Sequence, residues 1–190
     1  MADVVEIRWH GRGGQGVVTA SELLAEAALV EGKYFQALPE FGAERSGAPL
    51  RAYTRLSSSP IHLHCSVTNP DIVVVLDPTL LGVVKVTEGL KPDGTLVANT
   101  TLSPQQLRER LGLHTGRVYT VDATRIALDA YGRNIPNTPM LGALLRASPV
   151  VELAGVVQTV QSRLGSRVAA KVVEGNVQAL KRAFAETQAG

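Results

Sequence analysis

The stretch with the clearest chemical potential is a glycine-rich loop at residues 11–16, Gly-Arg-Gly-Gly-Gln-Gly, which follows a short apolar run and precedes a helical pattern. Glycine allows positive φ angles and leaves the backbone amides accessible. A loop of this kind at the start of a helix points free N–H groups and the positive end of the helix dipole at whatever lies above it. The loop is therefore a candidate anion-binding site, formed by Gly11, Arg12, Gly13, Gly14, Gln15 and Gly16.

The same loop matches the Gly-x-Gly-x-x-Gly fingerprint of dinucleotide-binding proteins, with a predicted strand before it and a predicted helix after it. The fingerprint also requires an acidic residue about 20 positions further on, which binds the ribose hydroxyl. Glu40 lies near that position, but it follows Pro39 in a loop-like sequence. Three interpretations stay open: a bound NAD or FAD, a tight turn without a ligand, and amides that meet a phosphate or a partner chain.

A second candidate site lies in the segment 39–55. Its first part is rich in Pro, Gly, Glu and Arg yet keeps one aromatic residue, which suits an interface anchor. The predicted interface-loop residues are Pro39, Phe41, Gly42, Glu44, Ser46 and Gly47. Arg45 and Arg51, with Arg55 behind them, could clamp a phosphate or a carboxylate. The alternative is an exposed ion-pair cluster with the neighbouring glutamates, which contributes little stability.

The remaining polar clusters favour ordinary structural roles. His62 and His64 would share one face of a strand while Cys65 points away, and no third ligand is near, so a metal site is disfavoured. Asp77 ends a buried strand, where ligands of α/β proteins gather, but Asp77-Pro78 is also a common helix start. No nucleophile–base pair is visible, because Cys65 lacks an activator and no serine lies in a G-x-S-x-G elbow. We therefore predict no catalytic residue and no metal site in this chain.

Composition narrows the class of protein. The chain has 190 residues, 45% of them apolar, which is enough for a proper core. A net charge of +2 and 4% aromatic residues disfavour nucleic-acid binding. The single cysteine excludes an internal disulfide and an iron–sulfur cluster held by this chain alone, which takes about four cysteines. No apolar run approaches the ~18 residues of a membrane span, and the N-terminus does not resemble a signal peptide, so we expect a cytoplasmic chain without membrane attachment.

Hydrophobic periodicity predicts alternating strands and helices. Expected strands are 4–9, 33–38, 50–56, 61–65, 71–77, 95–99 and 118–121, with 50–66 forming an antiparallel hairpin. Expected helices are one from Gly16 to Gly32, then 78–86, 104–111, 123–131, 140–147, 151–164 and 167–185. No strand pattern follows residue 121. The order indicates a three-layer α/β/α sandwich with a mostly parallel sheet, a β-hairpin insertion and a helical C-terminal part. We expect a single domain over 1–190, with an α/β core at about 1–134 and a helical end at about 135–190.

Six motifs, in order and spread over nearly the whole chain, resemble the gamma subunit of 2-oxoacid:ferredoxin oxidoreductases, whose usual members are the pyruvate and 2-oxoisovalerate enzymes. The motifs lie at 11–19, 39–49, 71–77, 87–90, 137–144 and 174–176. The first two, Gly-Arg-Gly-Gly-Gln-Gly-Val-Val-Thr and Pro-Glu-Phe-Gly-Ala-Glu-Arg-Ser-Gly-Ala-Pro, are long and specific.

The resemblance implies a role in a multisubunit enzyme. Such an enzyme decarboxylates a 2-oxo acid on thiamine diphosphate, transfers the acyl group to coenzyme A and passes electrons through iron–sulfur (4Fe-4S) clusters to ferredoxin or to an NAD-reducing subunit. Thiamine diphosphate and Mg are held by alpha and beta subunits, and the clusters by beta and a ferredoxin-like delta subunit. The gamma chain is thus expected to bind none of these cofactors and to be inactive alone.

The glycine loop, the arginines and the family resemblance together favour one hypothesis, beside which two alternatives stay open. The amides of 13–16, together with Arg45 or Arg51, are expected to face the catalytic core close to where the phosphates of coenzyme A enter. A subunit-interface role without coenzyme A contact is the more cautious version. The second alternative is a freestanding nucleotide-binding protein that uses the 11–16 loop.

Overall fold

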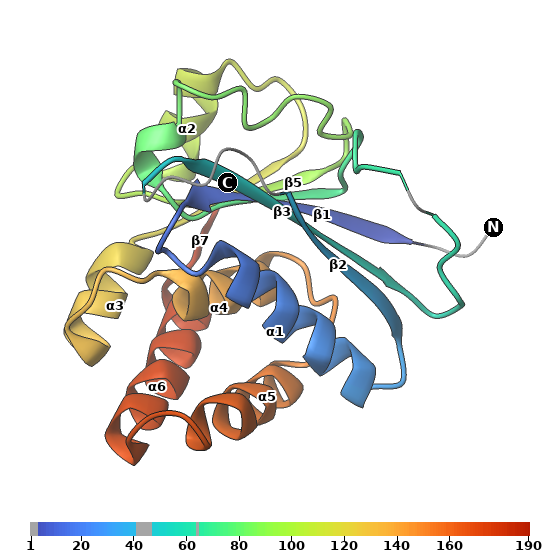
Figure 1. The fold of residues 1–190 in the computed structure, drawn as a ribbon. Helices are drawn as coiled ribbons and strands as arrows, with labels where there is room; N and C mark the ends of the chain where they lie inside the picture. The colour runs from blue at the N-terminus through green and yellow to red at the C-terminus, as the bar shows by residue number, and fades with distance from the viewer. Residues whose placement is uncertain (1–3, 41–46, 64) are drawn as a thin grey trace.

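The computed structural model describes residues 4–40, 47–63 and 65–190, which form one seven-stranded sheet with helices on both faces (Figure 1). Across the sheet the strands lie in the order β2-β3-β1-β4-β5-β6-β7. Their bounds are β1 Val5–Arg12, β2 Tyr34–Glu40, β3 Pro49–Ser57, β4 Ile72–Val75, β5 Thr95–Asn99, β6 Arg117–Val121 and β7 Gln188–Ala189.

The centre of the sheet is parallel and its two edges are antiparallel. Strands β1, β4, β5 and β6 pair in parallel. Strand β3 runs antiparallel to β1, β2 antiparallel to β3, and β7 antiparallel to β6. The expected α/β fold with parallel strands is confirmed, and the sheet is a mixed one.

Two helical layers enclose this sheet, as the three-layer prediction requires. The helices on one side of the sheet are α1 Val17–Val30, α3 Ala123–Tyr131, α4 Asn137–Ala147, α5 Leu153–Gly165 and α6 Ala170–Glu186. Of these, α1 and α4 pack directly on the strands, while α5 and α6 pack against α1 and α4. The other face carries α2 Pro104–Leu111 and the short 3-10 helix η1 Pro78–Leu80. Each layer has its own apolar core: the first gathers around β1, α1 and α4, and the second around β4, β5 and α2. None of the helices in the described ranges is long and apolar enough to cross a membrane.

Local signals fix several boundaries. Helix α2 starts with a capping box in which the Ser103 side chain accepts from the Gln106 N–H, and it ends at Gly112 with φ +63°. Asp122 caps α3 in the same way by accepting from the Arg125 N–H. The predicted bounds 95–99, 104–111 and 123–131 are therefore confirmed.

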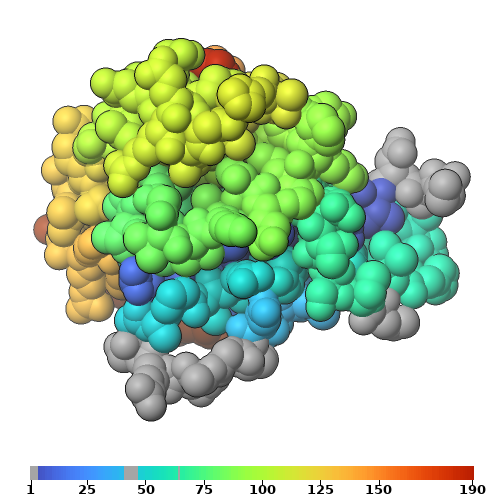
Figure 2. Space-filling model, turned by 90° about the horizontal axis from the view of Figure 1, so that it is seen from above, coloured from blue at the N-terminus to red at the C-terminus, as the bar shows by residue number. Residues whose placement is uncertain are grey.

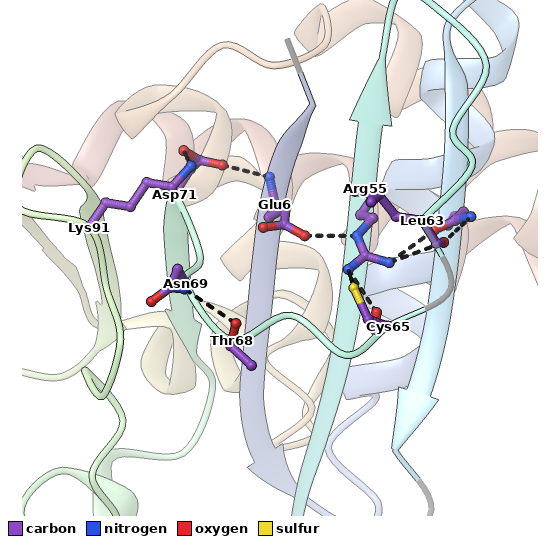
Figure 3. Close-up of polar contacts among 9 residues, drawn as sticks. Glu6, Arg55, Leu63, Cys65, Thr68, Asn69, Asp71 and Lys91 are labelled. Atoms are coloured by element: carbon purple, nitrogen blue, oxygen red, sulfur yellow. Dashed lines mark hydrogen bonds and ion pairs between the residues drawn. The ribbon is translucent and has the colours of Figure 1, made fainter. Parts of the chain in front are cut away.

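The predicted hairpin over 50–66 is wrong in its second strand. Strand β3 has β1 on one side and β2 on the other, so no free side is left for a strand at 61–65. The described residues of 61–65 instead cross over the sheet, where the Arg55 guanidinium donates to the carbonyl oxygens of Leu63 (3.5 Å) and Cys65 (2.8 Å) (Figure 3). The hairpin of this fold joins β2 to β3.

Two further predictions need correction. The helix expected over 78–86 is only the turn Pro78–Leu80, because Gly82 follows with φ +91°. A strand does follow residue 121, since Gln188 and Ala189 pair with Thr120 and Tyr119. Strand β7 has only two residues, which are too few to show the alternating apolar pattern by which a strand is predicted from sequence.

Candidate functional site

The glycine loop lies at the carboxyl ends of β1 and β4, two neighbouring parallel strands after which the chain continues on opposite faces of the sheet. After β1 the chain enters α1 on one face, and after β4 it enters η1 on the other. In open α/β sheets ligands bind in the crevice that forms outside the carboxyl ends of such strands. The loop 11–16 and the segment 77–79 therefore occupy the position where this fold class places its ligands.

Glycine is required in this loop by close packing as well as by φ. Gly16 begins α1 with φ +77°, and a Cβ added there would lie 2.6 Å from Asn137 Nδ2. A Cβ at Gly11 would lie 2.5 Å from Val17 Cγ2. Gly14 is different: its φ is +93°, but no atom of the described residues lies within 4 Å of the position that a Cβ would take. The outer side of the loop at Gly14 is thus the part that another molecule can approach.

Side chains of the protein itself bridge the crevice. Gln15 accepts from the Arg12 N–H (2.8 Å) and donates through Nε2 to Asp77 Oδ2 (2.5 Å). The Arg12 guanidinium donates to Thr79 Oγ1 (3.0 and 3.1 Å) and to the carbonyl oxygen of Gly47 (3.0 Å). The loop after β1 is therefore tied both to the segment after β4 and to the start of β3.

Asp77 places a negative charge in this crevice. Burial opposes its ionisation, but hydrogen bonds from Thr79 and Gln15 and the charge of Arg12, whose Nε lies 3.4 Å from Oδ2, outweigh that effect and lower the pKa of the Asp77 carboxyl. A phosphate inside the crevice would meet this carboxylate. Binding of an anion is thus favoured on the outer side of the loop rather than between the strand ends.

Several loop amides are already used within the fold. The Gly13 N–H donates to the Ala48 carbonyl (3.1 Å) and the Gln15 N–H to the Arg12 carbonyl (3.2 Å). Gly16, the N-cap residue of α1, has no side chain, and no other described side chain caps the first turn of this helix. The first N–H groups of a helix have no partner within the helix, so this uncapped turn is the part of the loop suited to an external acceptor.

Polar side chains line one face of β1 and β3 beside the loop. Alternation along β1 puts Arg8, His10 and Arg12 on the same face, and the register sets Arg51 opposite His10. His10 is 3% exposed, and its Nε2 accepts from Arg8 Nε (3.0 Å). Burial, reinforced by the charges of Arg8 and Arg51, lowers the pKa of His10 to about 3, so the imidazole is neutral.

A small cleft opens on this face. Its volume is about 220 Å³, and it is lined by His10, Glu40, Pro49, Leu50, Arg51, Leu80 and Val84. Arg51 is half-exposed, with Nε 3.9 Å from Glu40 Oε2, and Glu40 also accepts from the Tyr53 hydroxyl (2.6 Å). Figure 2 views the molecule from this side: the layer after β4, green to yellow, covers one part of the sheet, and the blue and cyan strands lie beside it.

The structure brings some of the predicted site residues together. Arg12 and Gln15 meet in the crevice, and Arg51 lies on the same sheet face as Arg12. Pro39 lies in β2, and Gly47 adopts φ +82° where its carbonyl accepts from Arg12. The other predicted loop residues, Phe41, Gly42, Glu44, Arg45 and Ser46, lie outside the described residues.

Sequence reasoning missed Arg8, His10 and Thr79. The signal for the first two was present, because Glu6, Arg8, His10 and Arg12 alternate with apolar residues along β1, whereas the run was interpreted as a wholly buried strand. Period-2 alternation indicates a strand with one polar face. The contact of Thr79 with Arg12 joins positions 67 residues apart and has no local signal.

The dinucleotide interpretation of the loop is not supported by the topology. The fingerprint places the second strand directly beside the first, but here β3 lies between β1 and β2. Glu40, the proposed ribose acceptor, is already bound to Tyr53.

The other clusters are structural. Asp71 accepts from the Glu6 N–H (2.8 Å) and pairs with Lys91 (2.5 Å), which fixes the start of β4 (Figure 3). Cys65 contributes its carbonyl to Arg55, and His64 lies outside the described residues. Within the described ranges, no group of three or more His, Cys, Asp and Glu side chains could hold a metal ion.

The fold and the site define an α/β protein with a braced glycine loop and an arginine-bearing sheet face. Residues 6–186 match the family described as pyruvate ferredoxin/flavodoxin oxidoreductase. The chain is 47% identical over 183 residues to pyruvate synthase subunit PorC of Thermotoga maritima, which covers 96% of this chain and 94% of the relative. It is 45% identical over 185 residues to the pyruvate/ketoisovalerate oxidoreductases common subunit gamma of Pyrococcus abyssi, covering 97% and 98%.

A solved structure gives the same result. The crystal structure of pyruvate oxidoreductase subunit PORC from Thermotoga maritima superimposes with a TM-score of 0.86 at 44% identity, covering 98% of both chains. This chain therefore belongs to the pyruvate ferredoxin/flavodoxin oxidoreductase family, as a gamma-type subunit of a 2-oxoacid oxidoreductase. The family match leaves no support for a freestanding nucleotide-binding protein.

Proposed function

We propose that this chain is a non-catalytic gamma subunit that packs on the thiamine-dependent core of its enzyme and helps to bind the phosphates of coenzyme A. One observation carries the proposal: Arg12 and Arg51 lie on one sheet face near the carboxyl end of β1, next to the glycine loop that follows this strand. Uncapped helix N–H groups and guanidinium groups are the usual protein ligands of phosphate.

The remaining chemistry is assigned to other subunits. Thiamine diphosphate and Mg would be held by alpha and beta chains and supply the decarboxylation of the 2-oxo acid. The 4Fe-4S clusters would be held by beta and a ferredoxin-like delta chain, since about four cysteines are required and this chain has only Cys65. Electrons would leave to ferredoxin or to an NAD-reducing subunit. The names of the relatives, pyruvate synthase and pyruvate/ketoisovalerate oxidoreductase, favour pyruvate or a branched 2-oxo acid as the substrate.

Within this function the site residues have separate tasks. Asp77 and Gln15 hold the loop and keep phosphate out of the crevice. Arg12 is braced by Thr79 and is positioned for an anion beyond the loop, while Arg51 is half-exposed and has only a 3.9 Å pair with Glu40. Arg51 can thus turn to a phosphate at little cost, because an exposed ion pair contributes little.

The test uses the whole enzyme carrying Arg51→Gln in this chain, with steady-state kinetics in coenzyme A and in the 2-oxo acid. Loss of a charge-assisted hydrogen bond should raise the Michaelis constant for coenzyme A about tenfold or more, with that for the 2-oxo acid unchanged. Arg117→Gln, an exposed arginine at the start of β6 and so at the other end of the sheet, is the matched control and should change neither.

The outcomes separate the two versions of the proposal. An unchanged Michaelis constant for coenzyme A in a fully assembled Arg51→Gln enzyme would reject phosphate contact. Failure of that variant to assemble with the larger subunits, with Arg117→Gln assembling normally, would establish this face as a subunit interface.

A further inference from the structure

Strand β2 is an edge strand whose outward backbone groups can be identified. The Asp71 and Leu76 N–H groups donate to the Glu6 and His10 carbonyls, so the even-numbered residues of β1 face β4. Backbone groups alternate sides along a strand, so the odd-numbered residues of β1 bond β3. The register then makes β3 bond Gln36, Leu38 and Glu40 of β2, and it leaves Phe35, Ala37 and Pro39 pointing away from the sheet.

This edge is apolar, and none of the described strands pairs with its outer side. Tyr34 is 48% exposed, and Phe35 and Leu38 are each 37% exposed. Leu29 and Val30, at the end of α1 just before β2, are 58% and 66% exposed. Native proteins usually protect an edge strand with charges, and a flat apolar edge is a template for pairing with another chain. The residues Tyr34–Leu38 carry no charged side chain, so the edge lacks that protection.

We propose that β2 pairs antiparallel with β2 of a second copy of this chain, about a two-fold axis at Gln36, and thereby joins two sheets into one. In this register Phe35 of one copy faces Ala37 of the other, and each exchanges N–H and carbonyl bonds with its opposite residue. The hydrogen-bond ladder between the two copies ends before Pro39, because proline has no backbone N–H to donate. The pairing therefore uses every outward donor between Phe35 and Pro39.

Side chains fit the same register. Large Phe35 lies opposite small Ala37, and Tyr34 lies opposite Leu38. Gln36 lies opposite its own copy, and its amide keeps its bonds to Arg55 and to the Leu63 carbonyl within each chain. No like charges face one another, because the flanking Lys33 and Glu40 fall opposite Pro39 and Gly32. Apolar and aromatic cross-strand pairs stabilise a sheet, and opposed like charges destabilise it. The edge is thus complementary to itself, which a two-fold interface requires.

The first test is sedimentation equilibrium of the purified full chain. We expect a dimer, and the variant Ala37→Pro should raise its dissociation constant about 30-fold or more, because each copy loses one outward donor. The Ala37 N–H does not bond β3, so the fold should stay intact, which far-ultraviolet circular dichroism checks. Ala37→Val keeps the N–H and is the matched control, and it should dimerise as the unchanged chain does.

The second test fixes the register. In the proposed register the Gln36 residues of the two copies form a non-hydrogen-bonded pair. Their Cα atoms would then lie about 4.5 Å apart, a distance that a disulfide can span. In a Cys65→Ser background, Gln36→Cys should form a disulfide-linked dimer, whereas Leu128→Cys, an exposed position on α3, should not.

Three outcomes would overturn the proposal: a monomer at all concentrations, a dimer that Ala37→Pro leaves unchanged, or no cross-link through Gln36→Cys. Loss of assembly with the larger subunits in Ala37→Pro, with a monomeric free chain, would assign the edge to another subunit and also reject the second copy. The coenzyme A proposal is independent, because its readout is the Michaelis constant of the Arg51→Gln enzyme.

Discussion

Strand β1 shows two different surfaces on its two faces. Toward α1, its residues Ile7 and Trp9 are fully buried among aliphatic side chains. Toward the other face, Arg8 and His10 are almost as buried, but they are held by hydrogen bonds, and Arg8 donates to the carbonyls of Val86 and Glu88. The same backbone therefore carries a packed core on one side and a buried polar network on the other.

The two faces of β1 are stabilised in different ways. The apolar face is stabilised by area removed from water and is insensitive to pH. The polar face is held by a guanidinium, a neutral imidazole and backbone carbonyls, so its contribution depends on protonation and on each partner being present. Protonation of one side chain, His10, can therefore disrupt the polar face, which is the face that adjoins the proposed coenzyme A site.

The largest effect is expected on the apolar face. Trp9→Ala should lower the free energy of unfolding by about 3–5 kcal/mol, because it removes a large, fully buried ring. Trp9→Phe keeps an aromatic ring but loses the hydrogen bond from Nε1 to Thr54 Oγ1 (3.0 Å), and it should cost about 1–2 kcal/mol. Urea unfolding followed by circular dichroism measures both. Equal losses in the two variants would show that ring volume does not dominate this face.

The next effect belongs to the polar face and appears only in acid. The pKa of His10 is lowered to about 3 in the folded chain, from an unfolded value near 6.5, so the folded state binds fewer protons between these values. Stability is therefore complete above about pH 6.5 and falls as the pH drops toward 3. At pH 4.5 the loss should be roughly 2–3 kcal/mol.

His10→Gln is the variant that isolates this term, since the amide oxygen can still accept from Arg8. Between pH 7 and pH 4.5 the unchanged chain should lose more unfolding free energy than the variant, because only the unchanged chain carries His10. Other titrating groups cancel in that difference. A constant difference across this range would mean that His10 takes up its proton without loss of structure.

A smaller effect is expected in the crevice. Asp77→Asn removes the charge that Arg12 and the hydrogen bonds of Thr79 and Gln15 stabilise, and it should cost about 1–2 kcal/mol at pH 7. The pKa of Asp77 is lowered, so its contribution is present above the unfolded pKa of about 4 and is lost as the pH falls below it. The unchanged chain and the variant should therefore converge in acid. A gap that persists there would point to packing instead of charge.

The smallest effect is expected from two ion pairs that join helices α1 and α5. Arg163 of α5 binds Glu22 and Glu26 of α1, which are 40% and 45% exposed. Arg163→Gln should cost about 0.5 kcal/mol, and less in high salt, because water and ions screen such pairs. A loss as large as that of Asp77→Asn, measured by urea unfolding in low and high salt, would contradict this ranking.

Much of the fold followed from local signals. Ser103-Pro104 and Gly112 bound α2, and the apolar run over 71–77 indicated a strand covered on both faces. The family followed from long motifs rather than from any single residue. These features share one property: each is encoded within about ten consecutive residues.

What could not be predicted depends on contacts between distant segments. The choice of β2 rather than 61–65 as the partner of β3 is decided by which side of β3 is open once β1 has paired. Gln15 and Asp77 meet across 62 positions, and the state of His10 depends on Arg8. The manner in which Gln15 and Asp77 close the crevice beside the predicted glycine loop therefore required the fold.

Trp9 is the one tryptophan of the chain, and it is shielded from water between β1 and α1. Its indole lies one residue before the polar His10 and two before the glycine loop. An emission spectrum of this subunit therefore reports from a single known location, directly behind the proposed phosphate-facing loop. Inside a complex, that signal would be separable only if the neighbouring subunits were made free of tryptophan or if this indole carried a distinguishing isotope or fluorine label.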